Sequence, residues 1–527
     1  MFRKRAKHRL VVIGDSLSQG FNNGCIYRTD LNYPSMLVNS LDDNIPFDQP
    51  LFTSQGGLPL NLEVLIRGLC DIYGKSIKPS EYLSAVKYLY STSRRIKKYW
   101  DGEYIPLNEE RRIPYHNQAI WGFSISDSWL MTEKHSREYV EKNPPRFNLM
   151  NIMHGNAMYT TARRVLNPSF SKNCENNSMI DNARYFAENG GIENLIVYLG
   201  SNNVLGAVTE LDIRYSEADH IEVPPYERTH TVTRPEHFEW LYRKLAEKVS
   251  SLGAERVITA TLPHITIPPV SRGINANRAQ KSQGYFDYYT RFWVWDDSFD
   301  PDIHPYLTKN EIIELDIIVD AYNQIIREVA NEYGWIVVPL GRMIDKLANR
   351  RMGADYLIPF PEEMVTALKK NENTRYLVLD KKHAHLTSDY LRLDDENGRI
   401  YKGGVFSLDG VHPTTIGYGL VAQEFYDTMV ANGIQFKRPI DWDFIVSSDS
   451  LITYPPYLLI ELRKILRFLS LGPREQWSRL SSNLFLQVMN LFNPGNGRDN
   501  KEHPSDEAGQ AAVPHTTGSE EIKSSGE

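Results

Sequence analysis

Cysteine is scarce in this sequence. Only Cys25, Cys70 and Cys174 occur among 527 residues, and they are too few and too scattered for a disulfide framework or a cysteine-based zinc site. The fold is therefore expected not to depend on disulfides. Because a reducing compartment suits such a protein, the cytoplasm is the expected location.

Long apolar runs and a strong charge of one sign are also lacking. No run approaches the roughly 18 apolar residues of a membrane span, and Leu10–Ile13 is too short for the core of a signal peptide. We therefore expect neither a signal peptide nor a transmembrane helix. The net charge is −7, and the basic stretch at residues 3–9 is short, so nucleic acid is not an expected partner.

The sequence does contain short β-rich runs separated by helical patterns, and near-continuous apolar runs suit strands that are buried in a parallel sheet. The predicted strands are Leu10–Ile13, Asn194–Leu199, Arg256–Leu262 and Trp335–Leu340. The predicted helices are Pro235–Leu252, Glu311–Tyr333 and Tyr418–Val430. Strands that alternate with helices predict an α/β fold with a mostly parallel sheet.

The spacing of these elements is uneven, which predicts insertions at about 40–110 and 264–310 within one domain at 1–437. The second insertion contains the aromatic run Tyr285–Trp295, which either lines a pocket or lid or forms a small core of its own. A helical C-terminal extension is expected at 438–493, and its polar continuation at 494–527 is expected to be disordered.

The extension contains an apolar segment, Leu458–Leu471, in which Arg463, Lys464 and Arg467 are set. Such a segment can lie on a lipid surface with its basic residues near the head groups. Packing of this segment against the main domain is the alternative, and it is the favoured one. A second amphipathic pattern follows at Trp477–Phe492. Peripheral membrane contact therefore stays an open alternative, and the sequence leaves the oligomeric state unknown.

The first strand ends abruptly in Gly14-Asp15-Ser16. Glycine, aspartate and serine are common turn and helix-cap residues, so the triplet can be a simple turn. A serine on a strand-to-helix turn can also be a nucleophile, with an exposed hydroxyl and a helix N-terminus beneath it. Ser16 is therefore a candidate nucleophile that needs a base and oxyanion donors from elsewhere in the chain.

The base and its partner are expected in L-D-G-V-H-P, where Asp409 and His412 are three residues apart. At that spacing the carboxylate can meet the imidazole edge, fix its tautomer and leave Nε2 facing outward as a base. His304, in D-I-H-P, has one residue fewer between the acid and the imidazole. His383 and His385 form H-A-H, but no ligand at a suitable spacing supports a metal site there.

Two segments offer oxyanion donors. Asn202 follows the predicted strand Asn194–Leu199 in G-S-N-N, so its amide can point into the crevice at the carboxyl ends of the strands. Gly122, in N-Q-A-I-W-G, can present an unobstructed backbone N–H group. Gly56 and Gly57, in F-T-S-Q-G-G, are rivals for this second role.

Four blocks occur in order: G-D-S-L-S-Q-G, N-Q-A-I-W-G, G-S-N-N and D-G-V-H-P. Together they resemble the GDSL family of esterases and lipases, also called SGNH hydrolases. The resemblance covers roughly residues 8–430 and implies a three-layer α/β/α fold, flavodoxin-like, with about five strands. The third block departs from the family's G-x-N-D because Asn203 stands where the family has aspartate.

The resemblance implies ester hydrolysis through an acyl-enzyme, with neither metal nor cofactor. Ser16 would be the nucleophile, His412 the base and Asp409 its orienting acid, while Ser16, Gly122 and Asn202 would form the oxyanion hole. A small-molecule or lipid ester is the expected substrate. Two alternatives stay open, an acyltransferase that uses the same acyl-enzyme and a non-catalytic α/β protein that binds a ligand.

Overall fold

The structure is a computed structural model of the chain, and it describes residues 6–42, 45–101, 110–144, 156–276, 284–291, 294, 299–347, 359–388 and 403–458. Of the predicted apolar segment Leu458–Leu471, all but Leu458 lies outside these residues, as do the predicted amphipathic pattern Trp477–Phe492 and the predicted tail at 494–527. So do three members of the aromatic run, Phe292, Trp293 and Trp295.

The central sheet has four parallel strands in the order β1-β5-β6-β10. Its strands are β1 (Val11–Gly14), β5 (Asn194–Tyr198), β6 (Arg256–Ala260) and β10 (Ile336–Val338). Every residue of β1 and β5 is buried, as expected for a parallel sheet covered on both faces. The α/β fold with a parallel sheet is thus confirmed, and all four predicted strands are present.

The three predicted helices are confirmed as α10 (Pro235–Ser250), α11 (Lys309–Tyr333) and α14 (Thr415–Ala431). α11 begins with a capping box, in which Thr308 and Glu311 satisfy each other's backbone N–H groups, and such reciprocal bonds fix a helix start. It ends at Gly334, which has the left-handed conformation that favours glycine. Local capping therefore sets both ends of this helix.

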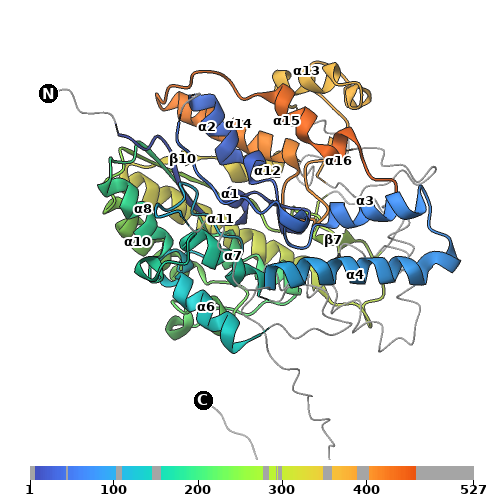
Figure 1. Ribbon diagram of the computed structural model, residues 1–527, viewed down its shortest axis with the longest axis horizontal. Coiled ribbons are helices and arrows are strands. Elements are labelled where there is room, and N and C mark those ends of the chain that lie inside the picture. The colour runs from blue at the N-terminus through green and yellow to red at the C-terminus, as the bar shows by residue number, and fades with distance from the viewer. Residues whose placement is uncertain are drawn as a thin grey trace, which may run out of the picture. The chain divides into compact units, whose positions relative to one another are not determined.

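The remaining helices are shorter on average. They are α1 (Ser16–Gln19), α2 (Tyr33–Leu41), α3 (Leu62–Tyr73), α4 (Tyr82–Asp101), α5 (Asp127–Leu130), α6 (Glu133–Lys142), α7 (Ala157–Leu166), α8 (Met179–Glu188), α9 (Gly206–Glu210), α12 (Leu340–Leu347), α13 (Glu362–Lys370), α15 (Trp442–Ser448) and α16 (Ser450–Thr453). α8 contacts β1, whereas α11 and α14 contact β10. α2 lies beside α14, and α3 lies beside α4 (Figure 1).

Both predicted insertions contain structure of their own. The first holds β4 (Leu58–Pro59), α3 and α4, and β4 joins β2 (Phe21–Asn22) and β3 (Cys25–Ile26) in a small antiparallel sheet. The second holds the antiparallel sheet of β7 (Ser271–Ile274), β8 (Tyr288–Arg291) and β9 (Tyr306–Thr308). A further pair, β11 (Leu386–Thr387) and β12 (Gly403–Gly404), is parallel.

Tyr288, from the aromatic run, packs with Ile274, Val294 and Phe299 in a small hydrophobic cluster of the second insertion. Its ring also contacts the ring of Tyr306, with centroids 5.0 Å apart. Tyr289, by contrast, belongs to the main hydrophobic core, so the described members of the run are divided between the two clusters.

The described part of the C-terminal extension packs into the main hydrophobic core. Trp442, Ile445 and Ile452 belong to the same buried cluster as β1 and β5. Asp449 accepts a hydrogen bond from the backbone N–H of Ile416 in α14 at 2.8 Å, which ties α16 to the start of that helix. Among the described residues, no helix is both long enough and apolar enough to cross a membrane.

Candidate active site

Ser16 is the first residue of α1, directly after the carboxyl end of β1. Asp15 is the N-cap of this helix and accepts a hydrogen bond from the backbone N–H of Leu17 at 3.1 Å. A Cβ atom added to Gly14 would lie 2.5 Å from Ser18 Oγ, so the tight turn requires glycine at this position. Ser16 is only 8% exposed, so the residue is largely buried, whereas the sequence predicted an exposed hydroxyl.

The carboxyl group of Asp15 is buried, with 1% of the residue exposed, and its Oδ2 has no hydrogen-bond partner among the described residues. Desolvation raises the pKa of Asp15 to about 7, although the N–H group of Leu17 partly offsets this rise. Burial without a cationic partner disfavours the charged form of a carboxyl. The residue before Ser16 is therefore largely protonated below neutral pH.

Asp409 and His412 form a buried hydrogen-bonded pair. The carboxylate Oδ2 lies 3.2 Å from His412 Nδ1, and Oδ1 accepts the backbone N–H groups of His412 and Val411 at 2.8 and 2.9 Å. Burial alone would raise the pKa of Asp409, but His412 and these N–H groups hold it below its ordinary value. An ionised carboxylate only accepts hydrogen bonds, so Nδ1 carries the proton and Nε2 is the acceptor.

The chain that follows α1 lies against this pair. The ring of Phe21, two residues beyond the helix, has its centroid 4.7 Å from that of His412. The hydroxyl of Tyr418 in α14 donates to the carbonyl of Phe21 at 2.7 Å, and the backbone N–H of Gly24 donates to Asp409 Oδ2 at 3.0 Å. These contacts bring the segment of Ser16 and the segment of His412 together.

Gly122 is held next to α1 by the chain that precedes it. Residues 116–120 run beside β1, where Gln118 N–H donates to the carbonyl of Val12 at 2.8 Å. Trp121 N–H donates to Gln19 Oε1, in the last position of α1, at 2.9 Å. Gly122 has a φ of 79°, in the region that favours glycine, so the chain turns just after this contact.

Asn202 lies in a short 3₁₀ helix, η5 (Ser201–Asn203), after β5. Its side-chain amide donates to the carbonyl of Phe123 at 2.9 Å, so the two predicted donors, Gly122 and Asn202, belong to adjoining segments. An amide has two N–H donors, and this bond uses one of them.

Asn203 holds η5 in place by contacts on two sides. Its Oδ1 accepts from the N–H of Ile125 at 3.3 Å and its Nδ2 donates to the hydroxyl of Thr233 at 3.1 Å. The amide provides an acceptor for one neighbour and a donor for the other. Asn203 therefore provides local support for η5.

A buried ion pair holds the loop that follows Gly122. Arg228 donates to both carboxylate oxygens of Asp127, at 2.8 and 3.2 Å, and to Ser124 Oγ at 3.1 Å. Asp127 is fully buried and its Oδ2 also accepts the N–H of Ser124 at 2.7 Å. A bidentate arginine–carboxylate pair fixes the orientation of the two side chains as well as the distance between them. The pair therefore holds the loop in one conformation.

The residues that the sequence offered as alternatives to Gly122 and His412 have other partners in the structure. The N–H of Gly57 donates to the carbonyl of Ser54 at 3.1 Å, so the structure gives this rival of Gly122 a turn role. His304 pairs through Nδ1 with the backbone of Asp300 rather than with the Asp302 carboxylate. His383 Nδ1 lies 2.8 Å from a carboxylate oxygen of Asp380 in an exposed turn.

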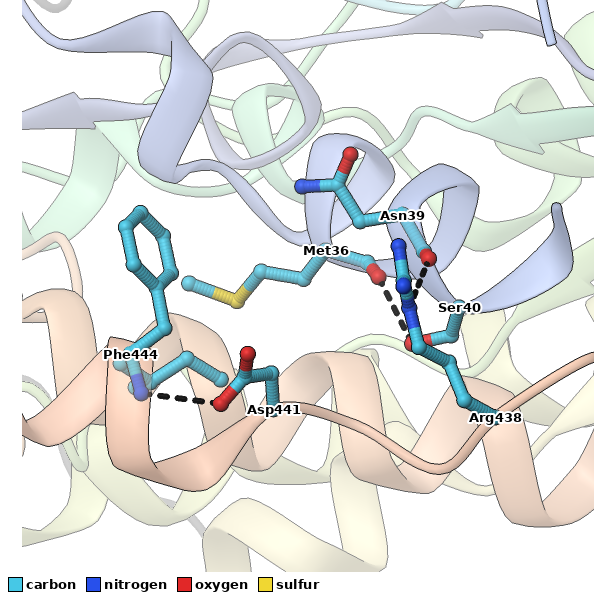
Figure 2. Close-up of a pocket in the computed structure, with 7 residues that line it drawn as sticks. Met36, Asn39, Ser40, Arg438, Asp441 and Phe444 are labelled. Carbon is cyan, nitrogen blue, oxygen red and sulfur yellow. Dashed lines mark hydrogen bonds between the residues drawn. The ribbon is translucent and has the colours of Figure 1, made fainter. Parts of the chain in front are cut away.

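Among the described residues, no three histidine, cysteine, aspartate or glutamate side chains are grouped to hold a metal ion. A surface pocket of about 240 Å³ lies between α2 and α15, with Met36 and Ile445 as apolar lining and Asn39, Arg438 and Asp441 as polar lining (Figure 2). It contains none of the predicted site residues.

The sequence analysis did not predict the β2–β3 hairpin, although Gly24 in its turn contacts Asp409 directly. Its turn residues Asn23 and Gly24 have φ values of 51° and 81°, as a two-residue hairpin turn requires. The dipeptide Asn-Gly is a strong local signal for such a turn. That signal predicts the hairpin, but it does not predict that the turn binds Asp409.

Comparisons with protein-family models and with curated proteins return no match to this chain. The likeness to GDSL hydrolases therefore rests on the four sequence blocks alone, and the catalytic roles are proposals.

Proposed function

We propose that this protein is a serine ester hydrolase of the GDSL type, acting on small-molecule or lipid esters through an acyl-enzyme. The observation that carries the proposal is the convergence of four segments that are far apart in the sequence. Phe21 contacts His412, Trp121 binds Gln19 of α1, and Asn202 binds Phe123. Each contact links the neighbourhoods of two proposed catalytic groups.

In the proposed reaction, Nε2 of His412 accepts the proton of Ser16 as the oxygen attacks the ester carbonyl. The negative charge that develops on the carbonyl oxygen is stabilised by the N–H groups of Ser16 and Gly122 and by the Asn202 amide. Asp409 stabilises the imidazolium, which then protonates the leaving alcohol. Water repeats the cycle on the acyl-serine, releasing the acid and free Ser16.

The fold proposed with this function is the three-layer α/β/α arrangement of SGNH hydrolases. The contact of α8 with β1 and the contacts of α11 and α14 with β10 support it. The bridge between Val12 and Asn117 adds a parallel partner beyond β1, in the position where a fifth strand of the sheet would lie.

The test is hydrolysis of p-nitrophenyl esters of increasing chain length and of acetylated sugars by the wild-type protein and Ser16→Ala. Ser201→Ala is the matched control, because Ser201 lies beside Asn202 and is partly exposed. We expect Ser16→Ala to abolish hydrolysis and Ser201→Ala to retain it. Wild-type rates in Ser16→Ala would show that Ser16 is not the nucleophile.

A further inference from the structure

Residues 407–412, which contain Asp409 and His412, are called the acid–base segment. Asn23 is the residue of the β2–β3 turn that makes the most contacts with this segment. Its backbone N–H donates to Ser407 Oγ at 2.9 Å, and its Oδ1 accepts the backbone N–H of Leu408 at 3.1 Å. The next residue, Gly24, donates to Asp409 Oδ2. Residues 407–409 are thus bound, one after another, by a turn about 385 positions away.

The remaining polar groups of Asn23 bind the first insertion. Its carbonyl accepts the N–H of Leu62 at 2.8 Å, and its Nδ2 donates to Glu63 Oε2 at 3.0 Å. Asn23 is 5% exposed, and its φ of 51° is one that asparagine tolerates better than most residues. All four of its hydrogen-bonding groups are therefore used, two toward the acid–base segment and two toward α3.

Glu63 in turn joins α3 to residues 450–458, called the C-terminal segment. Its Oε1 accepts from Arg67 Nη2 at 2.6 Å and from Ser450 Oγ at 2.7 Å. Arg67 also donates to the carbonyls of Ser450 and Tyr454, at 3.1 and 2.9 Å. Because ionised groups make stronger hydrogen bonds than neutral ones, Glu63 is a firm anchor for the amide of Asn23.

Apolar packing follows the same path. Leu408, the neighbour of Asp409, belongs to a hydrophobic cluster with Ile66 and Leu69 of α3 and with Leu451 and Leu458 of the C-terminal segment. Leu408 is thus packed between α3 and the C-terminal segment.

We propose that Asn23 is a positioning residue for the Asp409–His412 pair. Glu63, which lies in α3 and is bound to the C-terminal segment, orients the side chain of Asn23. This inference rests on the proposed esterase function. The amide of Asn23 fixes Leu408, the backbone that precedes Asp409, so the carboxylate meets Nδ1 of His412 in one orientation. The first insertion and residues 450–454 then help to hold Asp409 in position.

The test compares the wild-type protein with Asn23→Gly and Glu63→Gln. Glycine keeps the left-handed turn and both backbone hydrogen bonds and removes only the side-chain amide. We expect kcat to fall about 10-fold to 100-fold, since small misplacements of catalytic groups cost that much, while KM changes by less than about 2-fold. Glu63→Gln should show a smaller loss in the same direction.

The pH profile separates positioning from mere folding. A less well placed carboxylate stabilises the imidazolium less, so the acid limb of kcat/KM should move to lower pH in Asn23→Gly. Asn189→Gly is the control, because Asn189 is exposed at the end of α8 and has one side-chain hydrogen bond, to Tyr185. It should match the wild-type kcat and pH profile.

Melting temperatures show whether each variant is folded, and Glu63→Gln carries the test if Asn23→Gly is not. Wild-type kcat and an unshifted pH profile in folded Asn23→Gly and Glu63→Gln would overturn the positioning role alone. A wild-type protein that neither hydrolyses esters nor reacts with a fluorophosphonate at Ser16 would overturn the proposed function, and this inference with it.

Discussion

Asp15 is a buried carboxyl beside the proposed nucleophile, and its position links stability to pH. The folded-state pKa is about 7, against an ordinary value of 3.8. Between these values the folded state binds a proton that the unfolded state has lost, so stability falls as pH rises through this window. The loss for one such group is at most about 1.4 kcal/mol per pH unit.

Asp15→Asn keeps a side-chain acceptor at the N-cap and removes the ionisation. We expect its stability relative to the wild-type protein to increase by about 2–3 kcal/mol between pH 5 and pH 8. Urea unfolding at both pH values measures this difference. Asp302→Asn, at an exposed position, is the control. Parallel pH dependences of Asp15→Asn and the wild-type protein would contradict the assigned pKa.

At the scale of elements, long helices and strands build the fold, whereas the site lies on short ones. α1 has four residues, too few to be stable alone, and Gln19 and Ser18 fix it by bonding Trp121 and Tyr33. The proposed oxyanion donors, Gly122 and Asn202, lie on a loop and on a 3₁₀ helix. Such elements hold their shape only through contacts with distant parts of the chain.

The junction of α14 with α15 is a second place where one element depends on another. A Cβ atom added to Gly419 would lie 2.8 Å from the ring of Trp442 and 2.9 Å from Ile445 Cγ2. Alanine is worth about 1 kcal/mol more than glycine inside an isolated helix. Overpacking a core costs about 1–3 kcal/mol, so the two effects oppose each other here.

We expect Gly419→Ala to lower the free energy of unfolding by about 1–2 kcal/mol, because the helix does not separate from Trp442 without loss of core contacts. Urea unfolding checks this value. In a Trp442→Leu background the penalty should shrink, since the clashing ring is absent. A Gly419→Ala protein more stable than the wild type would mean that α15 does not pack on α14 as described.

At the scale of the whole molecule, the sequence predicts the central sheet well. The runs ending at Ile13 and Leu199 are strands because their residues are apolar almost without interruption, and the observed strands end within one residue of the predicted ends. The helix predicted at Glu311–Tyr333 from its period and the glycine that follows it is observed at Lys309–Tyr333. These signals are local, so they can be recognised from the sequence alone.

The contacts that assemble the site have no local signal. Asn23 and Ser407 are 384 residues apart, and nothing in either segment indicates the other. The motif around His412 predicts a pair with Asp409, and that pair is present. The role proposed for the first insertion as a support for Asp409 follows only from contacts in space, such as the hydrogen bond between Ser450 and Glu63.

Reaction of the intact protein with a fluorophosphonate, followed by peptide mass spectrometry, tests most directly whether Ser16 is activated by His412. We predict an adduct on the peptide that contains Ser16, and much slower formation of that adduct in folded His412→Ala. An adduct-free Ser16 in the wild-type protein, or labelling that is equally fast without His412, would contradict the account.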